Sequence, residues 1–431
     1  MPIGPFLGAL FSVLSIVPAL ALADGSTPTI PNTPAGHALV SWLDAFNSAD
    51  RGKFESFAKV HAPWLSLDQE MELRARTGGY DLVSIEGSGQ LWIVFHVKGR
   101  ANPAPVFGRL VVRTNDPEHI SLLGLAPAET KPAEIVLDEA ERSRVVGGAA
   151  RLLQEFYVFP DIAKRTASRL GAQQKRGDYR GITDGEVFAV RLSDDLTALS
   201  GDKHLGVDYF TKEMPPEEPT SRPHPDPRKL AASNCGFEKA DHYPPNIGYL
   251  KLNAFAEPDF CTSTAVAAMN FLADSDIIII DLRDNHGGAP RMAALLSSYL
   301  FEEPTHLDDI YDRKENTTEQ LWTFPYMPGK KFTGKPVYVL TSSRTFSVGE
   351  EFSFDLKSLK RATLVGETTG GGAHPMAPHR IDGHFFIRVP FGRIMNPITK
   401  ADWESTGVEP DVKVPAADAL DEALKLARGG P

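Results

Sequence analysis

Along the first third of the chain, the hydrophobic positions change from a helical to a strand-like period. The residues at helical spacing are Leu39, Trp42, Leu43 and Phe46, followed by Phe54 and Phe57. Four runs rich in β-branched and aromatic residues come next, separated by clusters of Gly, Ser, Pro and Asn: residues 80–85, 91–97, 106–112 and 120–125. We therefore predict an α+β accessory domain over residues 34–127, in which helices are followed by an antiparallel sheet.

The next segment, residues 136–210, has helical periodicity throughout. Asp138 and Glu141 form the sequence signature of a capping box, and apolar residues then recur at helical spacing as far as Phe156. Two further helices are predicted, one over residues 162–170 and one that starts at Thr183. This pattern indicates a small helical bundle. Prolines are dense in residues 211–245, so this segment is predicted to be a linker rather than a packed element.

From residue 246 onwards, apolar runs alternate with helical segments. Strands are predicted at residues 247–252, 277–282, 336–341, 362–365 and 384–389, and helices at 262–272, 290–300 and 348–359. The run 277–282 is apolar along nearly its whole length, as expected for a strand that is covered on both faces of a sheet. Residues 246–428 are therefore predicted to form an α/β core with a largely parallel sheet.

The N-terminus and the charge of the chain bear on its compartment and partners. Residues 1–23 carry no charged side chain, and their apolar stretch ends in the small-residue site Ala21-Leu22-Ala23. This pattern predicts a signal peptide over 1–23, and hence a secreted or periplasmic protein without an integral membrane span after its removal. The formal net charge of −11 disfavours a nucleic-acid partner, because phosphate binding needs clustered Lys and Arg. For Cys235 and Cys261, a disulfide bond and two separately buried thiols both stay open.

Four short motifs occur in the order and spacing typical of one peptidase family. Three follow predicted strands, at residues 281–288 (DLRDNHGG), 345–350 (TFSVGE) and 366–372 (GETTGGG), and the fourth, SGDKHL at 200–205, ends the helical bundle. Together they resemble the tail-specific, or carboxy-terminal-processing, serine peptidases of family S41, in the branch of the tricorn core proteases and interphotoreceptor retinoid-binding protein. The resemblance implies a ClpP/crotonase-like catalytic core preceded by a helical bundle. The N-terminal segment loosely resembles the nuclear-transport-factor-like α+β domains.

Ser347 lies where a predicted strand ends and a helix begins. A serine hydroxyl becomes a nucleophile only when a base takes its proton and amide donors hold the oxyanion, and otherwise a serine here is usually a helix cap. The Val348 N–H precedes the first intrahelical hydrogen bond and is free to act as a donor. The family resemblance assigns a second donor to the pair Gly287-Gly288, whose glycines permit close backbone approach. Glu350, one turn past the serine, is predicted to cap the helix or to be solvated.

The resemblance also implies a general base. Many tail-specific peptidases use a Lys within the glycine-rich motif, but residues 369–373 contain none. The tricorn-like branch uses a His from the upstream bundle and a Glu near the C-terminus, which His204 and Glu404 match here. Chemically, His204 would be the base and Glu404 would orient it, with His286 and His374 as competing bases. Where tricorn-like sites have a Ser before the His, this chain has Lys203, a cation that could lower the pKa of the base.

The hypothesis that follows is an exported serine peptidase with a Ser347–His204–Glu404 triad, which acts on a peptide or protein. Two alternatives stay open on the same fold: a non-catalytic protein that binds an apolar ligand such as a lipid or retinoid, and an esterase. No metal or organic cofactor is implied. A PDZ-like insertion for docking extended tails is not evident between the bundle and the core, where the Pro-rich segment stands.

Overall fold

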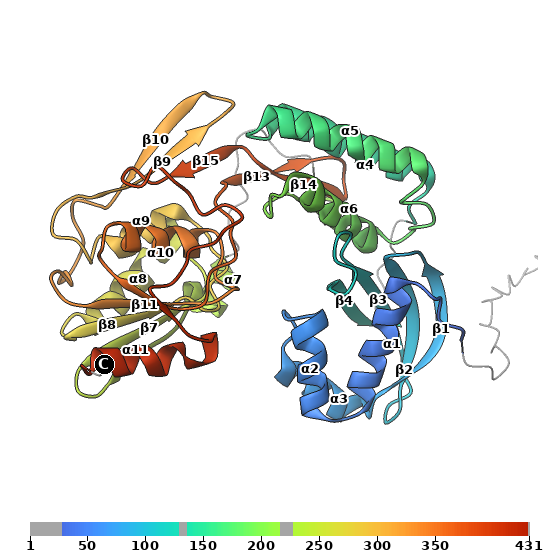
Figure 1. Ribbon diagram of the computed structural model, residues 1–431, viewed down its shortest axis with the longest axis horizontal. Coiled ribbons are helices and arrows are strands. Elements are labelled where there is room, and N and C mark those ends of the chain that lie inside the picture. Colours follow the sequence, from blue (N-terminus) through green and yellow to red (C-terminus); the bar gives the residue numbers. More distant parts are fainter. Residues whose placement is uncertain (1–27, 129–135, 216–226, 430–431) are drawn as a thin grey trace, which may run out of the picture.

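The structure, a computed structural model, describes residues 28–128, 136–215 and 227–429. They form an N-terminal α+β unit, a layer of helices and a C-terminal α/β core (Figure 1). The predicted signal peptide, residues 1–23, lies outside the described residues. Within the described ranges, every helix is too short or too polar to cross a membrane.

The N-terminal unit is a four-stranded antiparallel sheet with helices on one face. Its elements are α1 (Pro34–Asn47), α2 (Arg51–His61), α3 (Leu67–Thr77), β1 (Tyr80–Ser88), β2 (Trp92–Gly99), β3 (Pro105–Val112) and β4 (Ile120–Pro127), with the strands in chain order. Trp42 and Phe46 of α1 pack against the sheet, as their spacing predicts. The sequence did not predict α3, because this helix buries no residue fully and so has no apolar stripe.

Three helices follow: α4 (Glu139–Phe156), α5 (Pro160–Arg176) and α6 (Gly185–Ser200). The capping box at the start of α4 is confirmed, since Asp138 and Glu141 each accept a hydrogen bond from the other's backbone N–H. Helix α6 starts after Asp184 rather than at Thr183. Leu152 and Leu192 of the helices share a core with Trp92 and Phe107 of the N-terminal sheet. The helices therefore cover the sheet face that α1 leaves open.

The C-terminal core is a six-stranded sheet in the order β16-β12-β11-β8-β7-β6, parallel except for the pair β6 and β7. Its strands are β6 (Phe237–Tyr243), β7 (Ile247–Leu252), β8 (Ile277–Asp281), β11 (Val337–Thr341), β12 (Thr363–Gly366) and β16 (Val412–Lys413). The helices α8 (Pro258–Leu272), α9 (Pro290–Ser297) and α10 (Val348–Ser358) cover one face, and α11 (Ala419–Ala427) covers the other (Figure 1). The predicted α/β core with a largely parallel sheet is confirmed.

Two three-stranded sheets connect the core with the helices. One contains β9 (His306–Asp312), β10 (Thr317–Trp322) and β15 (Gly392–Met395), and the other contains β5 (Gly206–Tyr209), β13 (Met376–Arg380) and β14 (Phe385–Pro390). In the second sheet, β5, which follows α6, pairs with β14 from the last quarter of the chain. This pairing brings the end of the bundle next to the glycine-rich segment that precedes β13.

The prediction that residues 211–245 form an unpacked linker is wrong for the second half of this segment. That half contains α7 (Pro227–Ala232) and β6, which lies at the edge of the core sheet. Most side chains of β6 are exposed or half-buried, so the strand lacks the apolar run by which a central strand is recognised. Residues 216–226 lie outside the described part of the chain.

Cys235 and Cys261 form a disulfide bond, so the question that the sequence left open is answered. The bond joins the turn before β6 to α8 and closes a loop with a sequence separation of 26 residues. In the chain-entropy description, a loop of this length is worth about 3 kcal/mol of stability.

We expect a reductant to lower the urea midpoint of the wild-type chain, with a loss of about 3 kcal/mol in the free energy of unfolding. The measurement is urea unfolding followed by circular dichroism, with and without dithiothreitol. The matched control is the Cys235→Ala/Cys261→Ala double variant, whose midpoint should not respond to dithiothreitol. A wild-type midpoint that is the same with and without reductant would contradict the expected contribution.

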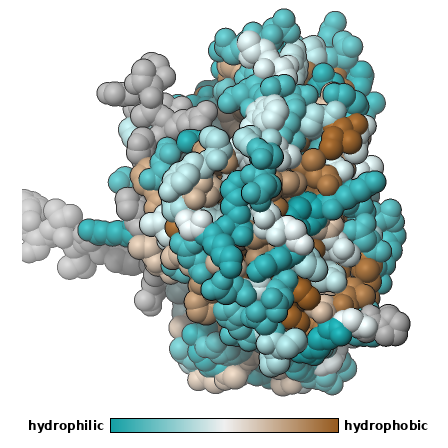
Figure 2. Space-filling view, turned by 90° about the vertical axis from the view of Figure 1, so that its left-hand side faces the viewer, coloured by the Kyte–Doolittle hydropathy of each residue, from teal (hydrophilic) through white to brown (hydrophobic). Residues whose placement is uncertain are grey.

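The end of the molecule that the α/β core forms is mostly hydrophilic (Figure 2). Hydrophobic residues on this face lie in small groups among polar ones. Scattered exposed hydrophobic residues are ordinary on protein surfaces and do not by themselves mark a binding site. Three of the four sequence motifs lie instead at the carboxyl ends of the core strands β8, β11 and β12, where open α/β sheets bind their ligands.

Candidate active site

Ser347 occupies the sharp turn between β11 and α10. Its φ of 54° and ψ of −121° are unusual for a residue with a side chain and cost on the order of 1–3 kcal/mol. In this conformation the Ser347 Oγ lies 3.3 Å from Nε2 of His204, a residue 143 positions away in the sequence. Ser347 is therefore more than a plain helix cap, because its hydroxyl contacts an imidazole that can take its proton.

His204 lies in the loop between α6 and β5 and is 6 % exposed. Its backbone N–H donates to Asp202 Oδ1 at 2.9 Å, and its ring packs on Phe346 with centroids 4.8 Å apart. Burial lowers the pKa of His204 to about 4, the charges of His374 and Arg388 act in the same direction, and Asp202 opposes them. The imidazole is therefore neutral at pH 7, as a general base must be.

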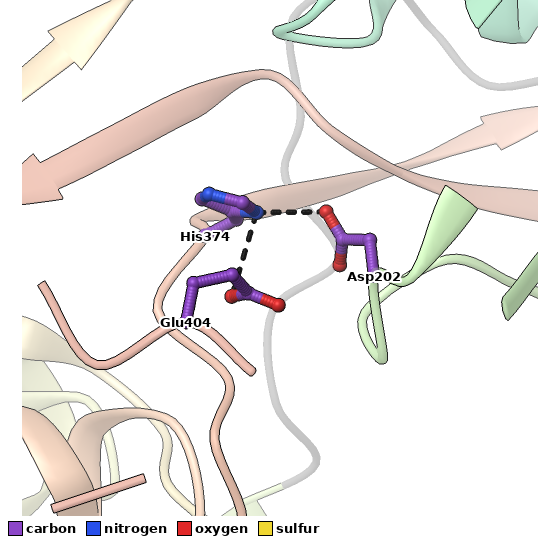
Figure 3. A group of neighbouring side chains, drawn as sticks. All are labelled: Asp202, His374 and Glu404. Carbon is purple, nitrogen blue, oxygen red and sulfur yellow. Dashed lines mark hydrogen bonds and ion pairs between the residues drawn. The ribbon is translucent and has the colours of Figure 1, made fainter. Parts of the chain in front are cut away.

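Three ionisable side chains, the buried Asp202 and His374 and the half-buried Glu404, converge on one another (Figure 3). The group lies beside His204, because Asp202 is next to the imidazole. Nδ1 of His374 donates to Asp202 Oδ2 at 2.7 Å, and the Tyr157 hydroxyl donates to the same oxygen at 3.0 Å. Oε2 of Glu404 lies 3.4 Å from His374 Nδ1 and accepts the Ala373 N–H at 2.6 Å. His374 is thus placed between two carboxylates, one from the end of the bundle and one from the segment after β15.

The charges of this group follow from its contacts. Burial opposes ionisation of Asp202, but the hydrogen bond and charge of His374, with the His204 backbone N–H, outweigh it and lower the pKa of Asp202. Burial likewise opposes protonation of His374, whose pKa is nevertheless raised by Asp202 and Glu404. Burial, reinforced by the nearby Asp202 charge, raises the pKa of Glu404 to about 7. At neutral pH the firmly ionised carboxylate of the group is that of Asp202.

Glu404 does not lie where the predicted triad requires it. Among the described residues, no hydrogen bond or ion pair joins Glu404 to His204, because Glu404 is held by Ala373 and His374. The carboxylate that faces the imidazole is that of Asp202, whose Oδ1 lies 4.0 Å from His204 Nδ1. That Nδ1 is buried and has no hydrogen-bond partner among the residues that the structure describes. Asp202 was not among the residues predicted from the sequence, although it lies two residues before His204 in the SGDKHL motif.

The other predicted participants have different positions. His286 is exposed, and the described residues place no hydrogen bond between it and Ser347. His374 is engaged with Asp202 rather than with the serine. The Lys203 ammonium donates to the Gly370 carbonyl at 2.5 Å. The pKa of His204 is lowered, as predicted, but the causes are burial and the charges of His374 and Arg388 rather than Lys203.

Glu350 is fully buried, so the prediction that it is solvated is wrong and the prediction that it caps α10 is correct. Its carboxylate accepts the N–H groups of Ser347, Gly371 and Gly372 at 2.6–2.9 Å and the Thr369 hydroxyl at 2.5 Å. Burial raises the pKa of Glu350, and these four hydrogen bonds oppose the shift. Glu350 thereby fastens the glycine-rich loop to the turn that holds Ser347.

The turn after β8 brings the two predicted glycines against Ser347. Gly287 and Gly288 have φ of 97° and 139°, and a Cβ on Gly287 would lie 2.7 Å from Ser347 Cβ and 3.1 Å from Val348 N. The Gly287 N–H donates to Asn285 Oδ1 at 2.9 Å. The N–H groups of Val348 and Gly288 make no hydrogen bond within the described part of the chain. These two predicted donors therefore stay available.

Comparisons with known proteins relate the chain to one family. The family model Peptidase family S41 matches residues 246–414, and the model for the N-terminal domain of peptidase S41 in eukaryotic IRBP matches residues 130–234. The chloroplastic carboxyl-terminal-processing peptidase 1 of Arabidopsis thaliana is 28 % identical over 194 residues, which cover 44 % of this chain and 38 % of that protein. Peptidase 2 of the same plant is 27 % identical over 255 residues, which cover 56 % and 47 %. This chain thus spans less than half the length of these relatives.

Among solved structures, a putative peptidase from Parabacteroides merdae superposes with a TM-score of 0.47 and 16 % identity over 66 % of this chain and 96 % of that one. The photosystem II D1 C-terminal processing protease superposes with a TM-score of 0.40 and 15 % identity, over 65 % of this chain and 94 % of that one.

Proposed function

The chain belongs to peptidase family S41, as its four motifs predicted, and from this premise we propose that it is a serine peptidase with Ser347 as nucleophile and His204 as general base. The observation that carries the proposal is the 3.3 Å contact between the Ser347 hydroxyl and the imidazole of His204. An unusual backbone turn, a buried neutral base and two unused amide donors surround this contact. This is the arrangement that acyl transfer needs.

The reaction proceeds in two halves. The Ser347 oxygen forms a bond to the peptide carbonyl carbon while its proton passes to His204 Nε2, and the carbonyl oxygen becomes an anion that the N–H groups of Val348 and Gly288 stabilise. The carbon–nitrogen bond then breaks, and His204 gives its proton to the leaving amine. Water, deprotonated by the same imidazole, cleaves the acyl-enzyme and restores the serine hydroxyl.

In this proposal, Asp202 replaces Glu404 as the carboxylate that supports the base. Proton transfer makes His204 positive, and a charge of this kind in a buried site needs a nearby ionised partner. Asp202 is ionised and lies 4.0 Å from Nδ1, so a shift of about 1 Å would create a hydrogen bond of ordinary length. Catalytic hydrogen bonds are often long before substrate binds. His374 holds Asp202 in place and keeps it charged, and Glu404 contacts His374 from the other side.

The proposed substrate class is a peptide or protein, and the proposed compartment is outside the cytoplasm. The relatives named above are carboxyl-terminal-processing peptidases, which makes a protein substrate the first choice to test. The disulfide between Cys235 and Cys261 supports export, because such bonds persist in oxidising compartments, and it agrees with the signal-like pattern of residues 1–23.

The proposal is tested with a fluorophosphonate probe, which reacts with activated serines. We expect the probe to label the wild-type chain on Ser347 and to leave a folded Ser347→Ala variant unlabelled, with the adduct located by peptide mass spectrometry. A folded wild-type sample that stays unlabelled would contradict the proposal, and a stoichiometric lipid in native mass spectra would then favour the apolar-ligand alternative. Rates of peptide and ester hydrolysis by the labelled protein separate a peptidase from an esterase.

Gly287→Ala should lower the labelling rate by roughly 10²-fold or more, the size of effect that loss of an oxyanion donor produces. The added Cβ would lie 3.1 Å from the Val348 nitrogen and intrude where the oxyanion must bind, at a residue whose φ is 97°. Gly334→Ala is the matched control, since this glycine also has a positive φ, of 70°, but no atom within 4 Å of the added Cβ. Equal labelling rates of the two variants would contradict the assignment of the oxyanion site.

A further inference from the structure

Three carboxylates meet in the protein interior beside α10. Glu351 and Asp355 lie four residues apart on α10 and so on one face of it, and Asp308 comes from β9. Their exposed fractions are 0 %, 2 % and 0 %, respectively. One oxygen of each lies within 4.8 Å of the others. The group is separate from the candidate active site, whose ionisable members are Asp202, His204, Glu350, His374 and Glu404.

The neutralising partners that buried carboxylates require are missing among the described residues. Both oxygens of Asp308 and both oxygens of Glu351 are buried, and no donor from residues 28–128, 136–215 or 227–429 reaches them. Within the described part of the chain, the one side-chain donor that reaches the group is the Asn396 amide, which donates to Asp355 Oδ1 at 3.1 Å. No ion pair of the described chain involves any of the three acids. Buried charges without a partner are strongly unfavourable, so this group calls for a positive charge from elsewhere.

We propose that Asp308, Glu351 and Asp355 bind a calcium ion that fastens α10, the helix that follows Ser347, to β9. The ligands are all oxygens, which hard divalent cations prefer, and three carboxylates can supply up to six of them. Calcium–oxygen distances of about 2.4 Å place ligand oxygens up to about 4.8 Å apart, in agreement with the observed spacing. Magnesium is disfavoured because it keeps several waters, and these side chains are sealed from solvent.

Proton sharing is the competing explanation. Without a cation, burial raises the pKa of Asp308 to about 7 and those of Glu351 and Asp355 well above their ordinary values, so the group would hold protons at neutral pH. The two explanations differ in their response to added calcium and to loss of one charge. An Asp308→Asn substitution keeps the shape of the side chain and removes one negative charge. It would weaken the binding of a metal ion, but it would reduce the repulsion among carboxylates that share protons.

The first test uses the full chain purified without chelator. We expect elemental analysis by plasma mass spectrometry to find about one calcium per chain, and EDTA to lower the melting temperature by roughly 5 °C relative to excess CaCl2. Asp308→Asn should weaken the calcium response by at least tenfold in half-saturating concentration, because calcium affinity follows the charge of the ligand set.

The control is Asp312→Asn in the same strand, where Asp312 Oδ1 accepts the Glu315 N–H at 3.0 Å and takes no part in the group. Its calcium response should equal that of the wild type. A chain that holds no calcium, melts at the same temperature in EDTA and in CaCl2, and becomes more stable on Asp308→Asn would overturn the proposal in favour of shared protons. Labelling of Ser347 by the fluorophosphonate probe is measured on the same samples, so failure of the calcium site and failure of the peptidase proposal are distinguishable.

Discussion

Replacement of His204 by alanine is expected to lower the rate of peptide hydrolysis, and of Ser347 labelling, by roughly 10⁴- to 10⁶-fold at pH 7. The reason is that Nε2 of this imidazole is the group that the structure places 3.3 Å from the serine oxygen. Without it the hydroxyl must lose its proton to water, while amide donors and substrate binding continue to operate. The measurement is the pseudo-first-order labelling rate, together with kcat/KM for a casein-derived peptide pool.

The matched control is His286→Ala, which removes the histidine that directly precedes the glycine pair in the sequence. Its side chain is exposed, so its loss should change the rates by less than about twofold. A His204→Ala protein that is folded and still labelled at the wild-type rate would remove the base from the mechanism. A large loss in His286→Ala instead would transfer the role to that residue.

The pH dependence follows from the burial of His204. Burial lowers its pKa to about 4, so the imidazole is protonated, and unable to accept a proton, only below that pH. The labelling rate of the wild type should therefore stay high down to about pH 5 and fall as the pH drops through 4. An acid limb centred near 6.5, the value for an exposed histidine, would show that the base is solvated or is another residue.

The sequence predicts the layers of this molecule better than it predicts the contacts of the site. Strands with a continuous apolar run, such as β8 and β11, were recognised because a strand buried on both faces has no polar alternation. The helix α3 and the edge strand β6 were missed for the opposite reason, since both leave most of their side chains in contact with solvent. A buried element has a recognisable hydrophobic pattern in the sequence, and an element with little burial has none.

The same distinction applies to the residues of the site. Ser347 and the glycine pair were found because they lie in short motifs that resemble those of the S41 peptidases, and such motifs leave a mark in the sequence itself. Contacts between distant segments leave none. Whether Glu404 reaches the imidazole or His374 depends on how the segment after β15 passes the end of the bundle, and in the folded chain it meets His374. The role of Glu350 as a buried anchor for the glycine-rich loop was hidden for the same reason.

The triad predicted from the sequence and the triad proposed from the structure differ in the carboxylate that supports His204: Glu404 in the first and Asp202 in the second. We expect Asp202→Asn to lower kcat by roughly 10³- to 10⁴-fold, the loss observed when the acid of a serine triad is neutralised. The isosteric Glu404→Gln substitution should cost less than about tenfold, because Glu404 contacts His374 and the Ala373 N–H rather than the imidazole of His204. Burial also raises the pKa of Glu404 to about 7, so this side chain is already partly neutral at pH 7 and has less charge to lose.

Both variants are compared at pH 7 with the same peptide pool, after circular dichroism has shown that each is folded. Retention of KM with loss of kcat in Asp202→Asn would place the defect in the chemical step, where a developing imidazolium needs its counter-charge.

The reverse order, a severe loss in Glu404→Gln and a mild one in Asp202→Asn, would return the supporting role to Glu404. It would mean that the Glu404 carboxylate turns from His374 to His204 when substrate binds. Glu404 has an oxygen available for such a turn, since neither its buried Oε1 nor Nδ1 of His204 has a hydrogen-bond partner in the described part of the chain. The Asp202 carboxylate needs a movement of only about 1 Å from its 4.0 Å separation to make that hydrogen bond, whereas Glu404 must first give up its contact with His374.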